Sequence, residues 1–349
     1  MGTRSLLAMF FAAGLALANG AVADGGKCKL VKIVDWPVRA VRNLIVVEGA
    51  INGQKIGIML DTGSTISLIL RSTAVRLDLP RREAKGARIF GLGGESRIEI
   101  ASVDDFRLGE VSTKDLQLFV AGERDFGEGV DVLLGENFLS RFDVEFDLAH
   151  RAVRLYQSRD CDGVSLAYWT TEVVGVVEIE PIDEARPRIG LTVRINGRPV
   201  DAMLDSGASS SVLTLQDAVS VGVTPDTPGV AAGYPSQGLG AKPVDSWVGS
   251  FQSFAIGNEN ISDVRIRFAD MYKDATYTDT RSRVAKSAGR TQPMLLGADF
   301  LRAYRTLVAH SQRRVYFTYS GGPVFRADPV APRRVPGPEG NPGAGTGGN

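Results

Sequence analysis

Short apolar segments separated by glycine and asparagine predominate along the chain, and few stretches show the 3.6-residue period of a helix. In the first half, apolar runs at residues 43–50 and 56–60 flank Asn52-Gly53. An Asn-Gly pair between such runs is typical of a tight β-hairpin, because both turn residues must adopt positive φ. Asn196-Gly197 repeats the arrangement in the second half. The pattern therefore predicts a mainly β protein that contains two similar hairpins.

The similarity of the two halves extends beyond the hairpins. Each predicted hairpin runs into an acidic turn, "IMLDTGSTIS" at residues 58–67 and "AMLDSGASSS" at residues 202–211. Each half then closes on an apolar strand, a glycine and a short helical turn, "VLLGENFLSRF" at residues 132–142 and "MLLGADFLRAY" at residues 294–304. An internal repeat of this extent indicates two domains of similar fold.

The repeat also sets the expected domain boundaries. We expect a first domain at residues 28–157, a linker at residues 158–165 and a second domain at residues 166–322. Residues 323–349 consist mainly of proline, glycine and charged residues, so we expect them to be disordered. The chain of 349 residues suits two domains of about 150 residues each.

The overall charge excludes some classes of partner. Lys and Arg number 40 and Asp and Glu number 40, so the formal net charge is zero, and no basic run stands out. A nucleic acid or an anionic membrane surface is therefore not an expected partner.

Residues 1–23 have the pattern of an export signal. Arg4 precedes an apolar run at residues 6–17, and Ala21-Val22-Ala23 forms an A-x-A cleavage site. The apolar run is shorter than the ~20 residues that span a bilayer. A buried N-terminal helix is the alternative. We expect an exported, periplasmic or extracellular protein that begins near Asp24 and has no stable membrane anchor.

Export changes the interpretation of the two cysteines. An oxidising compartment allows a disulfide between Cys28 and Cys161, and two unpaired thiols are the alternative. No lipid-anchor pattern precedes Cys28, and neither cysteine has the neighbouring histidine that a catalytic thiol needs. Two cysteines and two histidines also make a zinc site improbable, so we expect no metal and no cofactor.

The acidic turns carry the candidate chemistry at Asp61 and Asp205. A single Asp-Thr-Gly is usually an ordinary turn. Two copies at equivalent places in two repeated domains indicate more than an ordinary turn, because a pseudo-twofold axis would bring the two carboxyl groups to face each other. Two adjacent carboxylates cannot both stay ionised, so they share a proton. One can then accept a proton from water while the other donates one to a carbonyl.

These motifs resemble those of the retropepsin-like aspartic proteases. The matching elements are the Asp-[Thr/Ser]-Gly-[Ser/Ala] signatures at residues 61–64 and 205–208, and the apolar-apolar-Gly segments that end at Gly135 and Gly297. The resemblance covers roughly residues 43–317. The chain is similar to secreted bacterial proteins that fuse two retropepsin-sized halves. It implies two tandem retropepsin-like (acid protease) β-barrel domains, related by a pseudo-twofold axis, with a cleft between them.

The resemblance also implies roles for individual residues. Asp61 and Asp205 would be the catalytic pair, and the hydroxyls of Thr62 and Ser206 would hydrogen-bond across the axis. The remaining supporting residues of the two turns would be Gly63, Ser64, Gly207 and Ala208. Since the Ser64 hydroxyl could donate to Asp61 and Ala208 has no hydroxyl, we expect Asp205 to hold the shared proton.

A glycine-rich stretch in each half suggests a flap over the substrate. In the first half the candidates are Gly91, Leu92, Gly93 and Gly94, and a plain glycine-rich turn is an equal alternative. Tyr234 lies near the second stretch and is compared with the flap tyrosine of pepsin-like enzymes, although that tyrosine belongs to the first half in pepsins.

The chain departs from the family pattern after the closing glycines. Retroviral members usually have an arginine there, whereas this chain has Glu136 and Ala298, so the ion pair that braces the retroviral site is absent. His150 and His310 precede the final strand of each half, and we interpret them as a repeated turn position and not as catalytic bases.

An acidic cluster in the first half has the alternation of a strand. Asp143, Glu145 and Asp147 alternate with apolar residues, so we expect the acidic side chains on a solvated strand face.

The leading hypothesis is an exported aspartic endopeptidase that hydrolyses peptide bonds through a water activated between Asp61 and Asp205. Its substrate would be a peptide or protein in the inter-domain cleft. We expect a monomer with intramolecular domain pairing; pairing of each half with another chain is less favourable, because fusion gives a high effective concentration. The alternative function is a catalytically inactive retropepsin-like peptide-binding or structural module.

Overall fold

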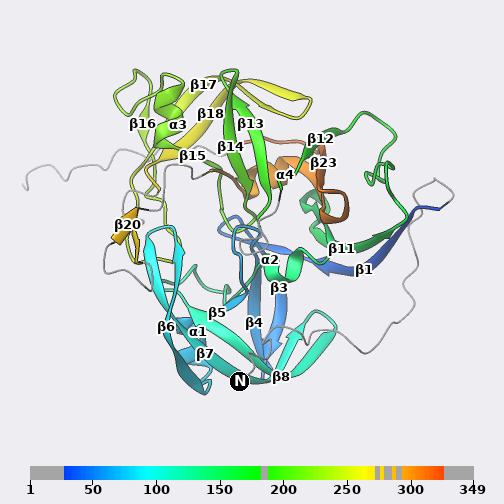
Figure 1. The fold of residues 1–349 in the computed structure, drawn as a ribbon, viewed down its shortest axis with the longest axis vertical. Helices are drawn as coiled ribbons and strands as arrows, with labels where there is room; N and C mark the ends of the chain where they lie inside the picture. Colours follow the sequence, from blue (N-terminus) through cyan, green and yellow to red (C-terminus); the bar gives the residue numbers. More distant parts are fainter. Residues whose placement is uncertain (1–26, 182–187, 272–275, 279–284, 288–292, 326–349) are drawn as a thin grey trace, which may run out of the picture.

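A computed structural model describes residues 27–181, 188–271, 276–278, 285–287 and 293–325. The predicted export signal and the part of the predicted tail beyond residue 325 lie outside the described residues. Among the described residues the fold is mainly β, with two barrels, a six-stranded sheet and a two-stranded sheet (Figure 1). In this view the first barrel lies at the bottom, in blue to cyan, and the second at the top, in green to yellow.

The first barrel is an eight-stranded sheet in the order β2-β3-β4-β9-β5-β8-β7-β6, and a further pairing of β3 with β7 closes it. Two short helices, α1 and α2, follow β5 and β9. The bounds are β2 (Arg39–Val41), β3 (Leu44–Ile51), β4 (Gln54–Leu60), β5 (Leu68–Leu70), α1 (Arg71–Arg76), β6 (Arg81–Gly91), β7 (Gly94–Leu108), β8 (Val111–Ala121), β9 (Val132–Leu134) and α2 (Glu136–Leu139).

The second barrel repeats this topology in the order β13-β14-β21-β15-β18-β17-β16, and the pairing of β13 with β17 closes it. A separate pair of strands, β19 and β20, lies in the chain between β18 and β21. The bounds are β13 (Gly190–Ile195), β14 (Arg198–Leu204), β15 (Val212–Thr214), α3 (Leu215–Ser220), β16 (Ala231–Ala232), β17 (Ser246–Ile256), β18 (Glu259–Ala269), β19 (Thr276–Thr278), β20 (Ala285–Ser287), β21 (Met294–Leu296) and α4 (Ala298–Ala303).

Both predicted hairpins form. Asn52 and Gly53 connect β3 to β4 with φ of 49° and 78°, and Asn196 and Gly197 connect β13 to β14 with φ of 49° and 79°. Positive φ at both positions is the geometry that an Asn-Gly pair favours. Each hairpin therefore delivers its second strand, β4 or β14, to the acidic turn that follows.

A six-stranded sheet joins the two halves in the order β1-β11-β10-β22-β23-β12. β10 of the first half pairs directly with β22 of the second, with Val144 opposite Val308. The bounds are β1 (Lys29–Pro37), β10 (Asp143–Asp147), η1 (Leu148–His150), β11 (Ala152–Arg159), β12 (Gly175–Glu178), β22 (Tyr304–Ala309), η2 (His310–Gln312) and β23 (Arg314–Tyr319). A disulfide joins Cys28, which precedes β1, to Cys161, which follows β11. Within the described residues, no helix is long and apolar enough to cross a membrane.

Apolar side chains fill both barrels and the contact between them. One cluster of buried residues includes Ile58 and Leu60 of β4, Leu204 of β14 and Phe300 of α4, all of them without exposed surface. The strands that lead to the two acidic turns are therefore anchored in a common core.

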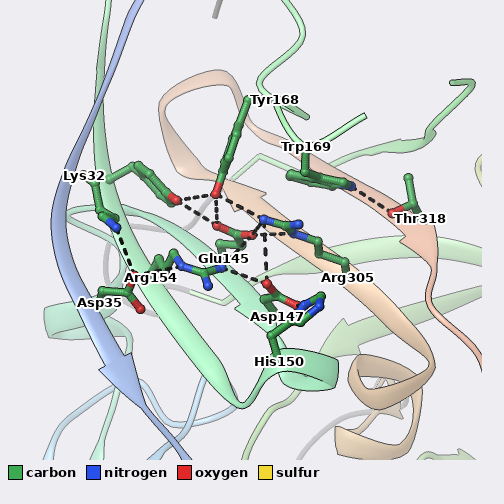
Figure 2. A network of polar contacts seen from close by, with 11 residues as sticks. Lys32, Asp35, Glu145, Asp147, His150, Arg154, Tyr168, Trp169, Arg305 and Thr318 are labelled. Carbon is green, nitrogen blue, oxygen red and sulfur yellow. Dashed lines mark hydrogen bonds and ion pairs between the residues drawn. The ribbon is translucent and has the colours of Figure 1, made fainter. Parts of the chain in front are cut away.

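The expectation that Asp143, Glu145 and Asp147 lie on a solvated face was wrong, because all three are buried. β10 is an interior strand of the joining sheet, and Tyr168 and Trp169 lie close to its polar side (Figure 2). Glu145 accepts hydrogen bonds from Tyr168 Oη at 2.7 Å and from Arg305 Nε at 2.6 Å.

Two arginines compensate the charge of this buried network. Arg154 Nη1 donates to Asp147 at 2.9 Å, and the Arg305 guanidinium lies 4.9 Å from the Trp169 ring centroid (Figure 2). Strand alternation alone cannot distinguish a solvated polar face from a covered one, because the covering residues belong to other segments of the chain.

The two histidines lie in short turns, as expected, but not at equivalent positions. Asp147 pairs with Ala152 across the β10–β11 turn, and Ala309 pairs with Arg314 across the β22–β23 turn. The first turn residue after β10 is Leu148, and the first turn residue after β22 is His310. His310 therefore corresponds to Leu148 and not to His150. His150 is exposed, whereas His310 is mostly buried.

Candidate active site

The ends of two equivalent strands position the two acidic turns. Asp61 follows β4, which pairs in parallel with β9, and the Asp61 amide donates to Leu134 O at 3.0 Å. Asp205 follows β14, which pairs in parallel with β21, and its amide donates to Leu296 O at 2.9 Å. Each aspartate thus sits at the end of an apolar ladder that continues into the core.

Backbone amides hold one oxygen of each carboxyl group. Asp61 Oδ1 accepts from the amides of Gly63 and Ser64, both at 3.1 Å. Asp205 Oδ1 accepts from the amides of Gly207 at 2.9 Å and Ala208 at 3.1 Å. The supporting residues predicted for each turn therefore orient its carboxyl group through the main chain.

Thr62 and Ser206 hold the two turns together with reciprocal hydrogen bonds. Thr62 Oγ1 donates to Leu204 O at 2.7 Å and accepts from the Ser206 amide at 2.9 Å. Ser206 Oγ donates to Leu60 O at 2.7 Å and accepts from the Thr62 amide at 3.0 Å. Both side chains are buried, so water does not compete for these four hydrogen bonds.

The two turns face each other across this contact. A methyl group at Gly63 would lie 2.4 Å from Asp205 Cγ, and one at Gly207 would lie 2.3 Å from Asp61 Oδ1. Only glycine leaves room for each turn to approach the opposite carboxyl group this closely. The carboxyl groups of Asp61 and Asp205 are close enough that each alters the pKa of the other.

Burial raises the pKa of both carboxyl groups. Asp61 and Asp205 are 8% and 9% exposed. Burial is the largest cause for each, and the charge of Asp205 raises the pKa of Asp61 further. Two such groups retain one proton between them over a range of pH in which an ordinary aspartate is ionised. The site can therefore present one carboxylate and one carboxylic acid side by side.

The predicted role of the Ser64 hydroxyl was wrong. Ser64 Oγ donates to Ile66 O at 2.8 Å, so it does not lower the pKa of Asp61, which is raised well above its usual range. The Gly63 amide also lowers the pKa of Asp205, and the asymmetry expected from Ser64 and Ala208 does not arise in the predicted way.

A second layer of serines, which the sequence analysis did not identify, ties each turn to the closing helix. Ser67 Oγ donates to Asn137 Oδ1 at 2.8 Å and accepts from the Gly135 amide. Ser211 Oγ likewise donates to Asp299 Oδ1 at 2.7 Å and accepts from the Gly297 amide. The signal was present, because both serines follow their aspartate by the same interval and both partners lie two residues after a closing glycine.

The first glycine-rich stretch forms the tip of the β6–β7 hairpin and reaches the second half. The Gly240 amide donates to Leu92 O at 3.0 Å, and the Lys242 amide donates to Gly93 O at 3.1 Å. Gly91 packs against Leu239. The two glycine-rich stretches of the repeat therefore meet each other.

Tyr234 precedes the second glycine-rich stretch. Its side chain is exposed, and its carbonyl oxygen accepts from Arg267 and Ser246. Tyr234 therefore contacts Arg267 and Ser246 through its main-chain carbonyl and not through its phenol ring.

Two cavities lie away from the paired aspartates, and neither is lined by Asp61 or Asp205. One of about 410 Å³ is mainly apolar and lies inside the first half, beside Phe106, Leu116 and Phe138. The other, of about 790 Å³, lies beside Trp36 and Gly57. Among the described residues, no group of three or more His, Cys, Asp or Glu side chains could hold a metal ion.

The sequence model of the family described as "Aspartyl protease" matches this chain twice, at residues 47–138 and 191–300. Each match contains one acidic turn and its closing glycine. The chain belongs to the aspartyl protease family.

Among solved structures, the protein is similar to the aspartic proteinase from Irpex lacteus, with 13% sequence identity and a TM-score of 0.47. The similarity covers 82% of this chain and 97% of that chain. No curated protein matches the chain in sequence.

Proposed function

We propose that this protein is an aspartic endopeptidase that hydrolyses peptide bonds with a water molecule activated between Asp61 and Asp205. The observation that carries the proposal is the pair of facing, buried carboxyl groups with raised pKa values. A module that only binds peptides has no need to hold two carboxyl groups together against their repulsion.

The chemistry follows from one proton shared by two carboxyl groups. The ionised carboxylate accepts a proton from water while the water oxygen attacks the carbonyl carbon of the peptide. The protonated partner donates its proton to the carbonyl oxygen, so a neutral tetrahedral intermediate forms. The intermediate then collapses, the C–N bond breaks, and the nitrogen takes up a proton from the dyad. One water is consumed and one carboxylic acid and one amine are released.

The surrounding residues would support this reaction in different ways. The Thr62 and Ser206 bonds hold the two carboxyl groups in register, which matters because misplacement of about 1 Å can cost about 10²-fold in rate. The tip of the β6–β7 hairpin, from Gly91 to Gly94, would cover a bound peptide, and Tyr234 is the candidate from the second stretch. The substrate would lie in an extended form between the two halves of one monomer.

Export to the periplasm or the extracellular space is part of the proposal. The Cys28–Cys161 disulfide is compatible with an oxidising compartment. The signal pattern of residues 1–23 supports the same location.

The test is cleavage of an unbiased peptide mixture by the purified protein from about pH 3 to 7, with mass-spectrometric detection of new termini. Asp61→Asn and Asp205→Asn keep the size of each side chain and remove its proton chemistry. We expect wild type to cleave and each variant to lose at least about 10²- to 10⁴-fold in kcat/KM. If folded wild type is inert across this range, the scaffold is an inactive peptide-binding or structural module.

A further inference from the structure

At two equivalent positions of the internal repeat, one set is apolar and the other is ionisable. Glu136 follows the closing glycine of the first half as Ala298 follows that of the second. His310 begins η2 as Leu148 begins η1. In one copy α4 packs against η1, and Ala298 of α4 and Leu148 of η1 are both buried in the main hydrophobic core. In the other copy, the equivalent residues are Glu136 and His310.

Glu136 and His310 come from different halves of the chain and meet in the interior. The distance from His310 Nε2 to Glu136 Oε2 is 3.7 Å. The side chains are 1% and 7% exposed. Glu136 Oε1 and both ring nitrogens of His310 make no hydrogen bond within the part of the chain that the structure describes. Buried polar groups are normally paired, so these orphaned atoms mark a site that does more than fill space.

Burial favours the neutral form of both groups. It raises the pKa of the Glu136 carboxyl to about 8 and lowers the pKa of His310 to about 4. Between these values Glu136 holds a proton and the imidazole is neutral. A small approach of the two side chains would let the carboxylic acid donate to Nε2, and the proton could then lie on either partner.

The pair also lies next to the paired aspartates. The Glu136 amide donates to Ser64 O at 2.8 Å, so α2 begins directly against the Asp61 turn. After burial, the charge of Asp61 is the other cause that raises the pKa of Glu136. Such coupling is reciprocal, so ionisation of Glu136 must raise the pKa of Asp61 by the same free energy.

We propose that Glu136 and His310 form a buried proton-sharing pair that positions the Asp61 turn against the opposite half and sets the charge beside the catalytic dyad. The inference rests on the proposed function, because it assigns a role to the pair in that reaction. The ionisable groups around it are Asp61 in the turn after β4 and Asp143 of β10, which accepts from the neighbouring Ser311. Both residues of the pair are positioning residues, since neither touches the reacting atoms.

The sign of the effect on the pH profile follows from the charges. When Glu136 ionises, its negative charge helps the dyad to retain the shared proton, so Glu136→Gln moves the alkaline limb of kcat/KM to lower pH. His310 is neutral above about pH 4, so His310→Leu removes no charge there and leaves the acid limb in place. We expect the shift in Glu136→Gln to be about half a pH unit or more, as is usual for interacting buried groups. A purely structural role would lower activity without moving either limb.

A first experiment needs no activity. The carboxyl groups are titrated by ¹³C NMR in wild type and Glu136→Gln, which identifies the Glu136 signal. We expect this signal to titrate near pH 8 in wild type and at lower pH in Asp61→Asn, where the repelling charge is gone. A Glu136 carboxyl that titrates at the usual pH of a glutamate overturns the proposal. So does a Glu136 pKa that is the same in wild type and in Asp61→Asn.

The kinetic experiment compares the limbs of the pH profile of the single variants with those of wild type. The control Glu136→Ala/His310→Leu installs the apolar residues found at the equivalent positions of the other half, so we expect it to fold and to show the same displacement of the alkaline limb as Glu136→Gln. Limbs that coincide with those of wild type in all variants overturn the inference alone. A wild type that cleaves nothing overturns the proposed function, and the NMR titration then decides the pair separately.

Discussion

The reciprocal bonds of Thr62 and Ser206 allow a quantitative prediction for Thr62→Val. Valine matches threonine in shape, so the change removes the hydroxyl and leaves the packing almost intact. Two buried main-chain groups then lose their partner, the carbonyl of Leu204 and the amide of Ser206. Each unsatisfied buried group costs about 1–3 kcal/mol, so we expect the free energy of unfolding to fall by about 2–6 kcal/mol.

Urea unfolding provides the assay, with the midpoint and the slope fitted for each variant. Thr192→Val is the matched control, because Thr192 is exposed on β13 and the same chemical change there should cost less than about 0.5 kcal/mol. Thr62→Val should also lower kcat/KM, since the bonds that hold the two carboxyl groups in position are lost. A Thr62→Val protein as stable as the control would refute the argument that these bonds hold the two turns together.

Three further predictions follow from the described contacts. Reduction of the Cys28–Cys161 disulfide, which links residues 133 positions apart, should lower the free energy of unfolding by about 5 kcal/mol in urea, and an unchanged midpoint with reductant would contradict this. Because the pKa of Asp205 is raised to about 6 in the folded state, its contribution to stability is full below the usual aspartate pKa and is lost as the pH rises through about 6. Wild type should therefore lose stability from about pH 4 to 6 while Asp205→Asn loses less, and parallel stability curves would count against the raised pKa. Gly93→Ala should reduce kcat/KM about 10-fold or more, because its methyl group would lie 2.4 Å from Lys242 O. Gly86 also has a positive φ but lies in open space, so Gly86→Ala should leave kcat/KM unchanged. Equal kcat/KM values for the two variants would show that the hairpin tip does not contribute to activity.

Local chemistry explains why parts of the fold were predictable. The two Asn-Gly hairpins depend on the φ values of two adjacent residues, so the sequence predicts them directly. The paired acidic turns were predictable for another reason. An internal repeat places Asp61 and Asp205 at equivalent positions, and a pseudo-twofold arrangement then brings them together without any knowledge of the loops between them.

The errors concern polar groups whose partners the sequence pattern did not identify. Asp143, Glu145 and Asp147 have the alternation of a solvated strand, but arginines and aromatic residues from later segments cover them. The Ser64 hydroxyl had two acceptors within reach, and the turn geometry directs it to Ile66 O and away from Asp61. In both cases the residue type was known and its surroundings were not.

The sequence by itself therefore determined the strands, the repeat and the two aspartates, because these depend on local conformation and on the similarity of the halves. Only the tertiary structure decided which charges are buried. It places His310 at the position of Leu148 and brings it within 3.7 Å of Glu136, a pairing between residues of different halves. The physical reason is that the energy of an ionisable group depends on the solvent and the charges around it, and these are supplied by segments that only folding brings near.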